Sequence, residues 1–424
     1  MYIRRVIFRN LRGFERLDFR LDGPLNQFAG WTVVTGDNGS GKTTFLKAIA
    51  LALVGPDSAR SLQPSLKGWI REGASTATIA VEIVAEENDR FAQGRRYKKP
   101  FWSELNLRPA PNSSEVALDS GKDFRGKGLG PFHGPWAETQ GWFSAGYGPF
   151  RRLYGASPDA QRIMSGPGRV ARYATMFYED ATLGECELWL KELRYKELEN
   201  RSREATVLKY VQDVLNNDFL HNGAKIDHIN SEGIWLSDPR KVVLPLRDIS
   251  DGYRAAMAMV CDILRQMIDV YAPDGRGLDF DVTKGVEFPG IVLIDEIDAH
   301  LHPEWQRQIG FWLKKVLPKV QFIVTTHSAL ICPAADSDRI YYLGGMDTLP
   351  FRLKPEDYLK VIRSKPNEIL LGPAFGMTQV LSPRAVEART KYAKLEAKRA
   401  ARPLDRAEAN EFRQLEMFVD PDEE

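Results

Sequence analysis

The spacing of apolar residues changes several times along the chain, and each spacing predicts a different kind of element. Short apolar runs at residues 2–8, 17–21 and 27–34 are typical of β-strands, and the third run leads into a glycine-rich bend. Between residues 42 and 53 the apolar residues recur at helical spacing, which predicts a helix. A further strand is expected at 76–84. This mixture of strands and helices indicates an α/β fold.

Residues 99–170 differ from the parts around them, because they are rich in glycine, proline and aromatic residues and show little periodicity. One more strand is expected before them, at 90–97. We expect residues 99–170 to form an irregular insertion that is packed and not a flexible linker, since so many aromatic side chains require burial. Helical spacing returns over residues 183–220.

The second half of the chain returns to an alternation of strands and helices, from about residue 242 to residue 328. The last segment, residues 382–424, predicts two charged helices on either side of Pro403.

Composition narrows the class of protein. Of the 424 residues, 43% are hydrophobic and 27% are charged, as in a globular protein, and no apolar stretch approaches the roughly 18 residues of a membrane span. The first ten residues lack the apolar core of a secretory signal, and the three cysteines lie far apart. We therefore expect a cytoplasmic protein with no membrane partner. The net charge of +1 means that DNA or RNA would need a local basic patch.

The glycine-rich bend at residues 36–43, GDNGSGKT, matches the phosphate-binding pattern GxxxxGK[ST]. It follows a predicted strand and opens a predicted helix, and this context disfavours an incidental glycine turn. Glycines let backbone N–H groups converge on phosphate oxygens, and the helix N-terminus favours negative charge. Lys42 would reach the β- and γ-phosphates, and the Thr43 hydroxyl would bind Mg²⁺. The residues expected at the phosphates are Asn38, Gly39, Ser40, Gly41, Lys42, Thr43 and Thr44.

Two acids end a short apolar run at residues 290–294, which predicts a central parallel strand buried on both faces. The carboxyl end of such a strand is where open α/β sheets bind ligands. Asp295 would hold Mg²⁺, and Glu296 would position and deprotonate an attacking water. The alternative is a pair of solvated acids in a turn, which the presence of the phosphate loop disfavours.

A second apolar strand, residues 322–326, is followed by His327. The interval after Asp295 accommodates one helix, at 305–316, and a return to the sheet. Such a strand–helix–strand unit would bring His327 to the edge where the phosphates bind, and its N–H could sense the γ-phosphate. The alternative is a structural histidine, which is the commoner role after a strand.

A helix start is predicted at residues 249–254, ISDGYR, where Ser250 is a suitable N-cap and Asp251 suits the first turn. Taken alone, this segment describes a well-capped core helix. Its apolar stripe consists of Val260, Ile263, Leu264, Met267, Ile268 and Tyr271.

In this order and with these flanks, the motifs GDNGSGKTT, ISDGYR, VLIDEID and TTHS resemble those of ABC-type ATPases, in the branch that contains SMC, Rad50 and RecF proteins. FRNLRGF, at residues 8–14, is similar to the N-terminal strand and turn of that branch. The resemblance implies a P-loop ATPase head, a mixed sheet flanked by helices, that is divided between residues 1–90 and 241–345. Residues 91–240 would then be an inserted irregular and helical region, and residues 346–424 a C-terminal helical region that docks a partner.

The resemblance also implies that ATP and Mg²⁺ bind between two copies of the chain, in a head-to-tail homodimer or a larger homo-oligomer. Ser250 and Gly252 of one copy would contact the γ-phosphate of the ATP held by the other. A helix N-terminus with a hydroxyl and a glycine suits that charge. Arg12 would reach a phosphate, as the matching basic residue does in Rad50-like proteins, and a solvated surface arginine is the alternative.

Within this branch, the chain resembles the OLD-like ATPases of bacterial antiphage defence systems, including the Septu type. The likeness is carried by the SDGYR spelling and by residues 147–151 and 298–303. Two features depart from the pattern. His302 occupies the usual position of the D-loop aspartate, and no Q-loop glutamine is evident, with Gln140 and Gln161 as candidates.

Three functions follow from these observations. The resemblance favours a regulatory ATPase subunit of a defence complex, which controls a separate effector such as a nuclease or toxin. The alternative is a RecF-like ATPase that binds DNA in repair or recombination. A scaffold that only binds ATP is disfavoured by the intact pair of Asp295 and Glu296.

We expect any nuclease chemistry to lie in another protein, because no acidic cluster ends a strand after His327. Asp336–Asp338 and Asp279–Asp281 are interpreted as surface loops. Residues 383–402 carry seven basic and two acidic side chains, and residues 419–424 are mostly acidic. This tail is either a solvated helical hairpin or a docking surface for an effector or nucleic acid.

Overall fold

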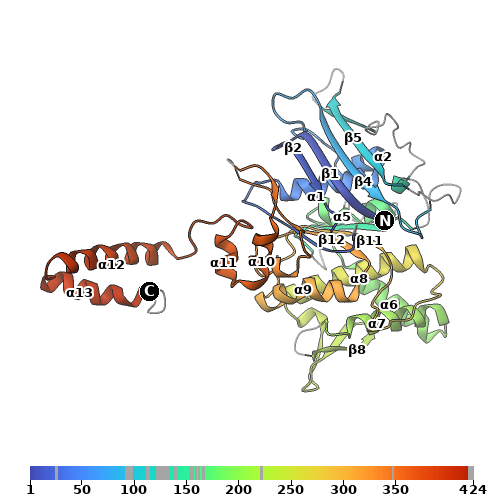
Figure 1. Cartoon of the computed structure of the whole chain (residues 1–424). Coiled ribbons are helices and arrows are strands. Elements are labelled where there is room, and N and C mark those ends of the chain that lie inside the picture. The colour runs from blue at the N-terminus through green and yellow to red at the C-terminus, as the bar shows by residue number, and fades with distance from the viewer. Residues whose placement is uncertain are drawn as a thin grey trace.

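The computed structural model describes residues 1–23, 27–90, 99–110, 115–120, 134–136, 141–151, 157, 160, 163–164, 168–219, 223–345 and 348–418. Two β-sheets enclose a central helix, a helical lobe covers the other face of the second sheet, and a helical hairpin projects away from this head (Figure 1).

The first sheet is antiparallel, with strand order β2-β1-β4-β5-β6. Its faces differ, as in β5, where Leu105 and Leu107 are buried and the intervening Asn106 is partly exposed. The apolar face of this sheet therefore turns inward. The strands are β1 (Tyr2–Leu11), β2 (Phe14–Arg20), β4 (Ala77–Val84), β5 (Phe101–Pro109) and β6 (Val116–Ser120).

The second sheet has the order β14-β13-β3-β12-β11-β7, and its paired strands are parallel except for β13 and β14. Strands β11 and β12 are buried along their whole length, because helices cover both faces of the sheet. The carboxyl ends of β3, β12 and β11 lie side by side, so the residues after them meet at one edge. The strands are β3 (Gly30–Thr35), β7 (Ser144–Tyr147), β11 (Gly290–Ile294), β12 (Val320–Thr325), β13 (Ile340–Tyr342) and β14 (Phe351–Arg352).

Helix α1 (Lys42–Val54) lies between the two sheets and is buried on nearly every side. Its residues share one apolar core with β1 and β4 of the first sheet and with Ile291, Leu293 and Ile323 of the second. This packing on both sides fixes the position of the first turn of α1. Shorter helices of the head are α2 (Pro56–Leu62), α4 (Gly168–Ala171) and α5 (Ala174–Phe177), with 3₁₀ turns at Gly134–Trp136, Leu246–Asp248 and Cys332–Ala334.

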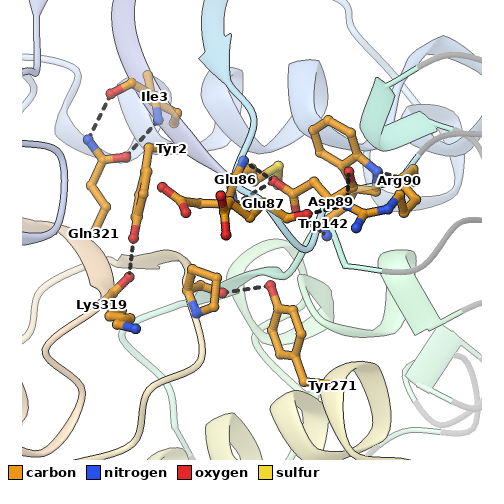
Figure 2. Close-up of polar contacts among 12 residues, drawn as sticks. Tyr2, Ile3, Glu86, Glu87, Asp89, Arg90, Trp142, Tyr271, Lys319 and Gln321 are labelled. Carbon is orange, nitrogen blue, oxygen red and sulfur yellow. Dashed lines mark hydrogen bonds and ion pairs between the residues drawn. The ribbon is translucent and has the colours of Figure 1, made fainter. Parts of the chain in front are cut away.

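Polar contacts join the start of β1, in the first sheet, to the start of β12, in the second (Figure 2). The side-chain amide of Gln321, in β12, accepts a hydrogen bond from Ile3 N at 2.7 Å and donates one to Ile3 O at 2.8 Å. The hydroxyl of Tyr2 donates to Lys319 O at 2.9 Å. These contacts hold the two sheets in one orientation around α1.

A second core lies between the second sheet and the helical lobe. The predicted stripe of α8 faces this core: its first five residues are buried, and Tyr271 at the end of the helix is partly buried. The lobe contains α6 (Glu185–Leu198), α7 (Ser202–Leu215), α8 (Asp251–Tyr271) and α9 (Pro303–Val316), with the antiparallel strands β8 (Lys225–Asn230), β9 (Gly233–Ser237) and β10 (Val243–Pro245).

The C-terminal part begins on the head and ends in a hairpin that projects from it (Figure 1). In the hairpin, the rings of Tyr392 and Phe412 stack with 4.5 Å between their centroids. The prediction of two charged helices around Pro403 is confirmed. The helices of this part are α10 (Pro355–Arg363), α11 (Pro366–Leu371), α12 (Pro383–Ala401) and α13 (Arg406–Leu415), followed by a 3₁₀ turn at Glu416–Phe418.

The structure confirms the α/β head, its mixed sheet flanked by helices and its helical C-terminal region. The interpretation of residues 99–170 as irregular is wrong in three places. Strands β5 and β6 extend the first sheet across the predicted boundary at residue 90, and β7 is the edge strand of the second sheet. The four residues of β7 are too few, and Ala145 and Gly146 too small, to give a strand pattern. The strand expected at 90–97 lies outside the described residues, except for Arg90.

Candidate functional site

The predicted phosphate-binding loop connects the end of β3 to the first turn of α1. Gly36, Gly39 and Gly41 have positive φ angles of 147°, 79° and 95°. At Gly41 a side chain would also collide with the ring of Phe14, because a Cβ would lie 2.7 Å from its Cζ. The loop therefore needs glycine to close over the N-terminus of α1, where backbone N–H groups and the helix dipole favour a phosphate.

Lys42 opens α1 and is almost fully buried. Its Nζ donates to Gly36 O at 2.8 Å and to Asp37 O at 2.9 Å. Burial lowers the pKa of the Lys42 ammonium, and the carboxylates of Asp295 and Glu296 partly offset this effect. The positive charge is thus held inside the loop, at the place where it could bind phosphate.

The two residues expected to bind magnesium lie together. Thr43 Oγ1 donates to Asp295 Oδ2 at 2.7 Å, although 252 positions separate these residues in the chain. Asp295 is only 1% exposed. A hydroxyl and a carboxylate are oxygen ligands of the kind that Mg²⁺ prefers, usually together with phosphate oxygens and water. Among the described residues no group of three or more His, Cys, Asp or Glu side chains is placed to hold a metal.

Thr325, which the sequence did not single out, joins both acids. Its hydroxyl donates to Asp295 Oδ1 at 2.5 Å and accepts from Glu296 N at 2.8 Å. Thr325 is the last residue of β12, the strand beside β11, so its side chain meets the end of β11. The available signal was a hydroxyl residue at the end of an apolar strand, but threonine is common in strands and the signal is weak.

Glu296 follows Asp295 with a φ of 46°, a conformation that residues other than glycine rarely adopt. Its side chain is half-buried, whereas the side chain of Asp295 is enclosed. The backbone therefore turns sharply between the two acids, and the Glu296 carboxylate stays accessible to water.

His327 lies at the same edge, two residues after the end of β12. Its backbone N donates to Asp298 Oδ1 at 3.3 Å, and Thr326 Oγ1 donates to the same oxygen at 2.5 Å. The predicted strand–helix–strand unit is confirmed as β11, α9 and β12. It leaves the side chain of His327 exposed at this edge.

Ser250 is the N-cap residue of α8, as predicted, and its hydroxyl makes no capping hydrogen bond. In the first turn Asp251 instead pairs with Arg254. Ser250 is exposed, whereas Gly252 is buried, and a Cβ on Gly252 would lie 2.1 Å from His300 O. The start of α8 thus packs directly against the loop after β11.

Arg12 lies in the turn between β1 and β2, with a φ of 47°. Its Nη1 donates to Thr44 Oγ1 at 3.0 Å, and its guanidinium carbon lies 4.5 Å from the centroid of the Trp69 ring. The structure therefore brings Arg12 to the first turn of α1, beside the phosphate-binding loop. Its contact with a phosphate stays a prediction.

His302 begins α9 as its N-cap, and its Nδ1 accepts from Glu304 N at 3.3 Å. An aspartate side chain can cap a helix in the same way. The departure from the D-loop pattern therefore preserves the local fold of this segment.

The remaining residues that the sequence singled out are Asp336, Gln140, Gln161 and the acidic segment 419–424. Asp336 is half-buried and accepts from Trp31 N at 2.6 Å and from Lys314 Nζ at 2.8 Å, so it ties its loop to β3 and α9. Gln140 and Gln161, the Q-loop candidates, lie outside the described residues, as does the acidic segment 419–424. Within the described ranges, no helix has both the length and the apolar character to cross a membrane.

A glycine-rich loop before α1, two acids after β11 and the exposed start of α8 are thus placed around one mixed sheet. These features define a P-loop head of the ABC type. In these features the chain is similar to the ABC-type ATPases of the branch that includes SMC, Rad50 and RecF proteins.

Comparisons with known proteins agree with this class. Residues 5–107 match a family described as "AAA domain", and residues 169–332 match one described as "AAA domain, putative AbiEii toxin, Type IV TA system". The Septu protein PtuA of Bacillus mycoides (strain KBAB4) is 27% identical over 324 residues, 76% of this chain and 37% of that protein. The retron Ec83 probable ATPase of Escherichia coli is 39% identical over 108 residues, 26% of this chain and 18% of that protein.

A solved structure of an Smc head, bound to the C-winged helix domain of ScpA, aligns with 85% of this chain and 100% of its own, at 17% identity and a TM-score of 0.46. The matched relatives are longer proteins, of which the chain spans 37% and 18%. The chain is thus similar to part of a Septu protein and to part of a retron ATPase.

Proposed function

We propose that the chain binds ATP with Mg²⁺ and hydrolyses it to ADP and phosphate. The observation that carries this proposal is the hydrogen bond between Thr43 and Asp295 at 2.7 Å, with Thr325 bonded to both Asp295 and Glu296. These contacts assemble oxygen ligands for Mg²⁺ and a water-accessible carboxylate beside the phosphate-binding loop.

The proposed roles follow from the position of each group. Lys42 and the N-terminus of α1 bind the negative charge of the β- and γ-phosphates. Thr43 and Asp295 would hold Mg²⁺, which would neutralise charge on the phosphates when bound. Glu296 accepts a proton from water while the water oxygen bonds to the γ-phosphorus and the bond from that phosphorus to the bridging oxygen of ADP breaks. His327 contacts the γ-phosphate from the same edge.

We also propose that two copies enclose ATP head-to-tail. The support is the start of α8, where Ser250 is exposed, makes no capping hydrogen bond and stands at the positive end of a 21-residue helix. Ser250 and Gly252 of one copy would contact the γ-phosphate held by Lys42 of the other. ATP then joins the two copies, and hydrolysis releases them.

For the biological role, we propose that this ATPase regulates an antiphage defence complex and controls a separate effector, a nuclease or a toxin, in the cytoplasm. The similarity to a Septu protein and to a retron ATPase favours this role over the RecF-like alternative, in which the chain would bind DNA. The effector would dock on the C-terminal region, residues 346–424.

Two substitutions test the chemistry. Lys42→Ala should abolish ATP binding in calorimetry, because the buried positive charge of the loop is lost. Glu296→Gln should keep ATP binding and lower the rate of phosphate release by at least about a hundredfold, the size expected for loss of a general base. Glu356→Gln, an exposed acid on α10, is the matched control and should hydrolyse ATP normally. Unchanged hydrolysis by Glu296→Gln would contradict the assignment.

A third substitution tests the dimer. Ser250→Arg should prevent the ATP-dependent increase in mass that light scattering detects, while the melting temperature stays unchanged. Ser202→Arg places the same side chain on an exposed serine at the start of α7 and should dimerise normally. Dimerisation by Ser250→Arg would rule out the head-to-tail arrangement.

Neighbouring genes test the biological role. An adjacent gene for a nuclease or toxin supports control of an effector. A cluster of replication or repair genes supports the RecF-like alternative instead.

A further inference from the structure

Arg151 is a buried arginine next to the candidate catalytic acids Asp295 and Glu296. It follows β7 by four positions and is only 4% exposed. Burying an arginine is costly unless its N–H groups are paired. The partners of Arg151 therefore show what the buried charge stabilises.

The guanidinium of Arg151 donates to carbonyl oxygens of the loop that carries Glu296. Nη1 donates to Asp295 O at 3.0 Å, and Nη2 donates to Glu296 O at 3.1 Å. Longer contacts at 3.4 Å join Nη2 to Ile297 O and Ala299 O. One side chain thus binds four carbonyls within five consecutive residues, 295–299.

This loop needs such support because its backbone is strained. Glu296 and His300 have φ angles of 46° and 66°, and each such conformation costs of the order of 1–3 kcal/mol outside glycine. The backbone curls so that its carbonyl oxygens converge on one point. Their negative partial charges would repel one another there without a cation, and the Arg151 guanidinium supplies it.

The segment that carries Arg151 is itself anchored. Its Nη1 also donates to Gly148 O at 3.0 Å, so the turn after β7 closes on the guanidinium. Tyr147 O accepts from Asp295 N at 2.8 Å, and the Tyr147 hydroxyl donates to Asp262 Oδ2, in α8, at 2.8 Å. The segment that carries Arg151 is therefore fixed to the sheet and to α8. Its guanidinium is held in one place beside the loop that carries Glu296.

The charge of Arg151 persists at neutral pH. Burial lowers the pKa of its guanidinium to about 10, and the carboxylates of Asp298, Asp295 and Glu296 partly offset that effect. The group therefore remains a cation under the conditions in which ATP hydrolysis would be measured.

We propose that Arg151 is a positioning residue for ATP hydrolysis: through four backbone carbonyls it holds Glu296 in the orientation from which its carboxylate can activate water. This inference rests on the proposed function of Glu296. Arg151 does not reach the phosphate-binding loop in any contact described above, so its loss should affect the rate of the chemical step and not the binding of nucleotide.

The test compares Arg151→Gln and Arg151→Lys with the full-length unmodified chain. For Arg151→Gln we expect kcat to fall by about a hundredfold, the effect of misplacing a reacting group by about 1 Å. Its Kd for the non-hydrolysable analogue AMP-PNP with Mg²⁺ should stay within about threefold, since transition-state positioning alone is lost. Arg151→Lys keeps a charge but fewer donors, and its kcat should lie between the two.

Arg339→Gln is the matched control. Arg339 is 1% exposed and donates to Phe28 O at 2.8 Å and Ala29 O at 2.9 Å, at the end of β3 opposite the phosphate-binding loop. Its substitution also removes a buried guanidinium from backbone carbonyls. We expect it to lower the melting temperature and to leave kcat, measured well below that temperature, within about twofold of the unmodified value.

The outcomes separate this inference from the proposed function. An unchanged kcat for folded Arg151→Gln, or a parallel loss of kcat and AMP-PNP binding, would overturn the positioning role. If Arg151→Gln does not fold, the same comparison of kcat with AMP-PNP binding in Arg151→Lys decides. If the unmodified chain releases no phosphate, or Glu296→Gln releases it normally, the proposed function fails instead.

Discussion

The edge where β3, β11 and β12 end and the α12–α13 hairpin are both rich in polar contacts, but the contacts differ in kind. At the edge, Thr43 and Asp295 are 252 positions apart, and Thr325 bonds to Asp295 inside the protein. In the hairpin, Arg402 pairs with Glu408 at 2.8 Å, six positions away, and the arginine side chain is 52% exposed.

This difference in burial determines how much each contact contributes to stability and function. A buried hydrogen bond lies in a medium of low polarity, and removing one partner leaves the other unpaired there. An exposed ion pair competes with water and salt, and its partners are solvated when it breaks. Equal substitutions should therefore have large effects at the edge and small effects in the hairpin.

Thr325→Val gives the largest expected difference. Valine has the same shape but cannot bond to Asp295 or Glu296, so kcat for ATP hydrolysis should fall roughly 10–100-fold, as when a group that orients a metal ligand is lost. Phosphate release at several Mg²⁺ concentrations measures this effect. Thr390→Val is the same substitution on α12, where the hydroxyl donates to Val386 O at 2.8 Å, and it should leave kcat unchanged. Equal effects of Thr325→Val and Thr390→Val on kcat would contradict the expected difference between the edge and the hairpin.

Gly252→Ala is the next in size. The new Cβ would lie 2.1 Å from His300 O, so the start of α8 must shift, at a cost of about 1–3 kcal/mol in the free energy of unfolding. ATP-dependent dimerisation should weaken as well, and light scattering combined with denaturant unfolding measures both quantities. Gly168→Ala meets its nearest atom, Arg172 Nη2, at 3.7 Å and serves as the control. A Gly252→Ala variant as stable as this control would show that the contact is not tight.

Tyr147→Phe should have a smaller effect. It removes the buried hydrogen bond to Asp262, which keeps Arg265 as a partner, at a cost of about 0.5–1.5 kcal/mol in the free energy of unfolding. Tyr178→Phe removes an exposed hydrogen bond, from the hydroxyl to Ser61 O at 2.7 Å, and should cost less. Denaturant unfolding measures the loss of stability in both variants. A larger loss in Tyr178→Phe than in Tyr147→Phe would contradict the expectation that the buried hydrogen bond contributes more.

Glu408 gives the smallest expected effect. The hydrogen bonds from Arg402 lower the pKa of the Glu408 carboxyl to about 2, from an ordinary value of 4.5. Because the folded pKa is the lower one, the pair stabilises the hairpin above about pH 4.5, and this contribution is lost as the pH falls through about 2. The protection of residues 383–415 against hydrogen exchange, taken relative to the intrinsic exchange rate at each pH, should fall over that range, and less so in Glu408→Gln. ATP hydrolysis at neutral pH should not change in this variant.

The parts of the site that the sequence predicted are those with a local pattern. Lys42 and Thr43 stand in a loop whose glycines and flanking elements are all contiguous, and Asp295 and Glu296 directly follow a fully apolar strand. The stripe of α8 was equally visible, because helical spacing is repeated over 21 residues. Each of these signals is contained in one short segment.

The parts that were missed depend on which strands are neighbours. Thr325 reaches Asp295 only because β12 pairs with β11, and Arg151 reaches the same loop only because β7 pairs with β11 on its other side. Strand order is set by packing of the whole sheet, and no local pattern in one sequence encodes it. β7 was itself hard to predict, because it has only four residues.

The close approach of Gly252 to His300 has a consequence for how two copies would work together. In a head-to-tail pair, the loop of His300 belongs to the pocket of its own copy, whereas Gly252 closes the pocket of the other. A movement that follows hydrolysis in one pocket would therefore displace a wall of the second. Hydrolysis in one pocket would then change how the other pocket is closed.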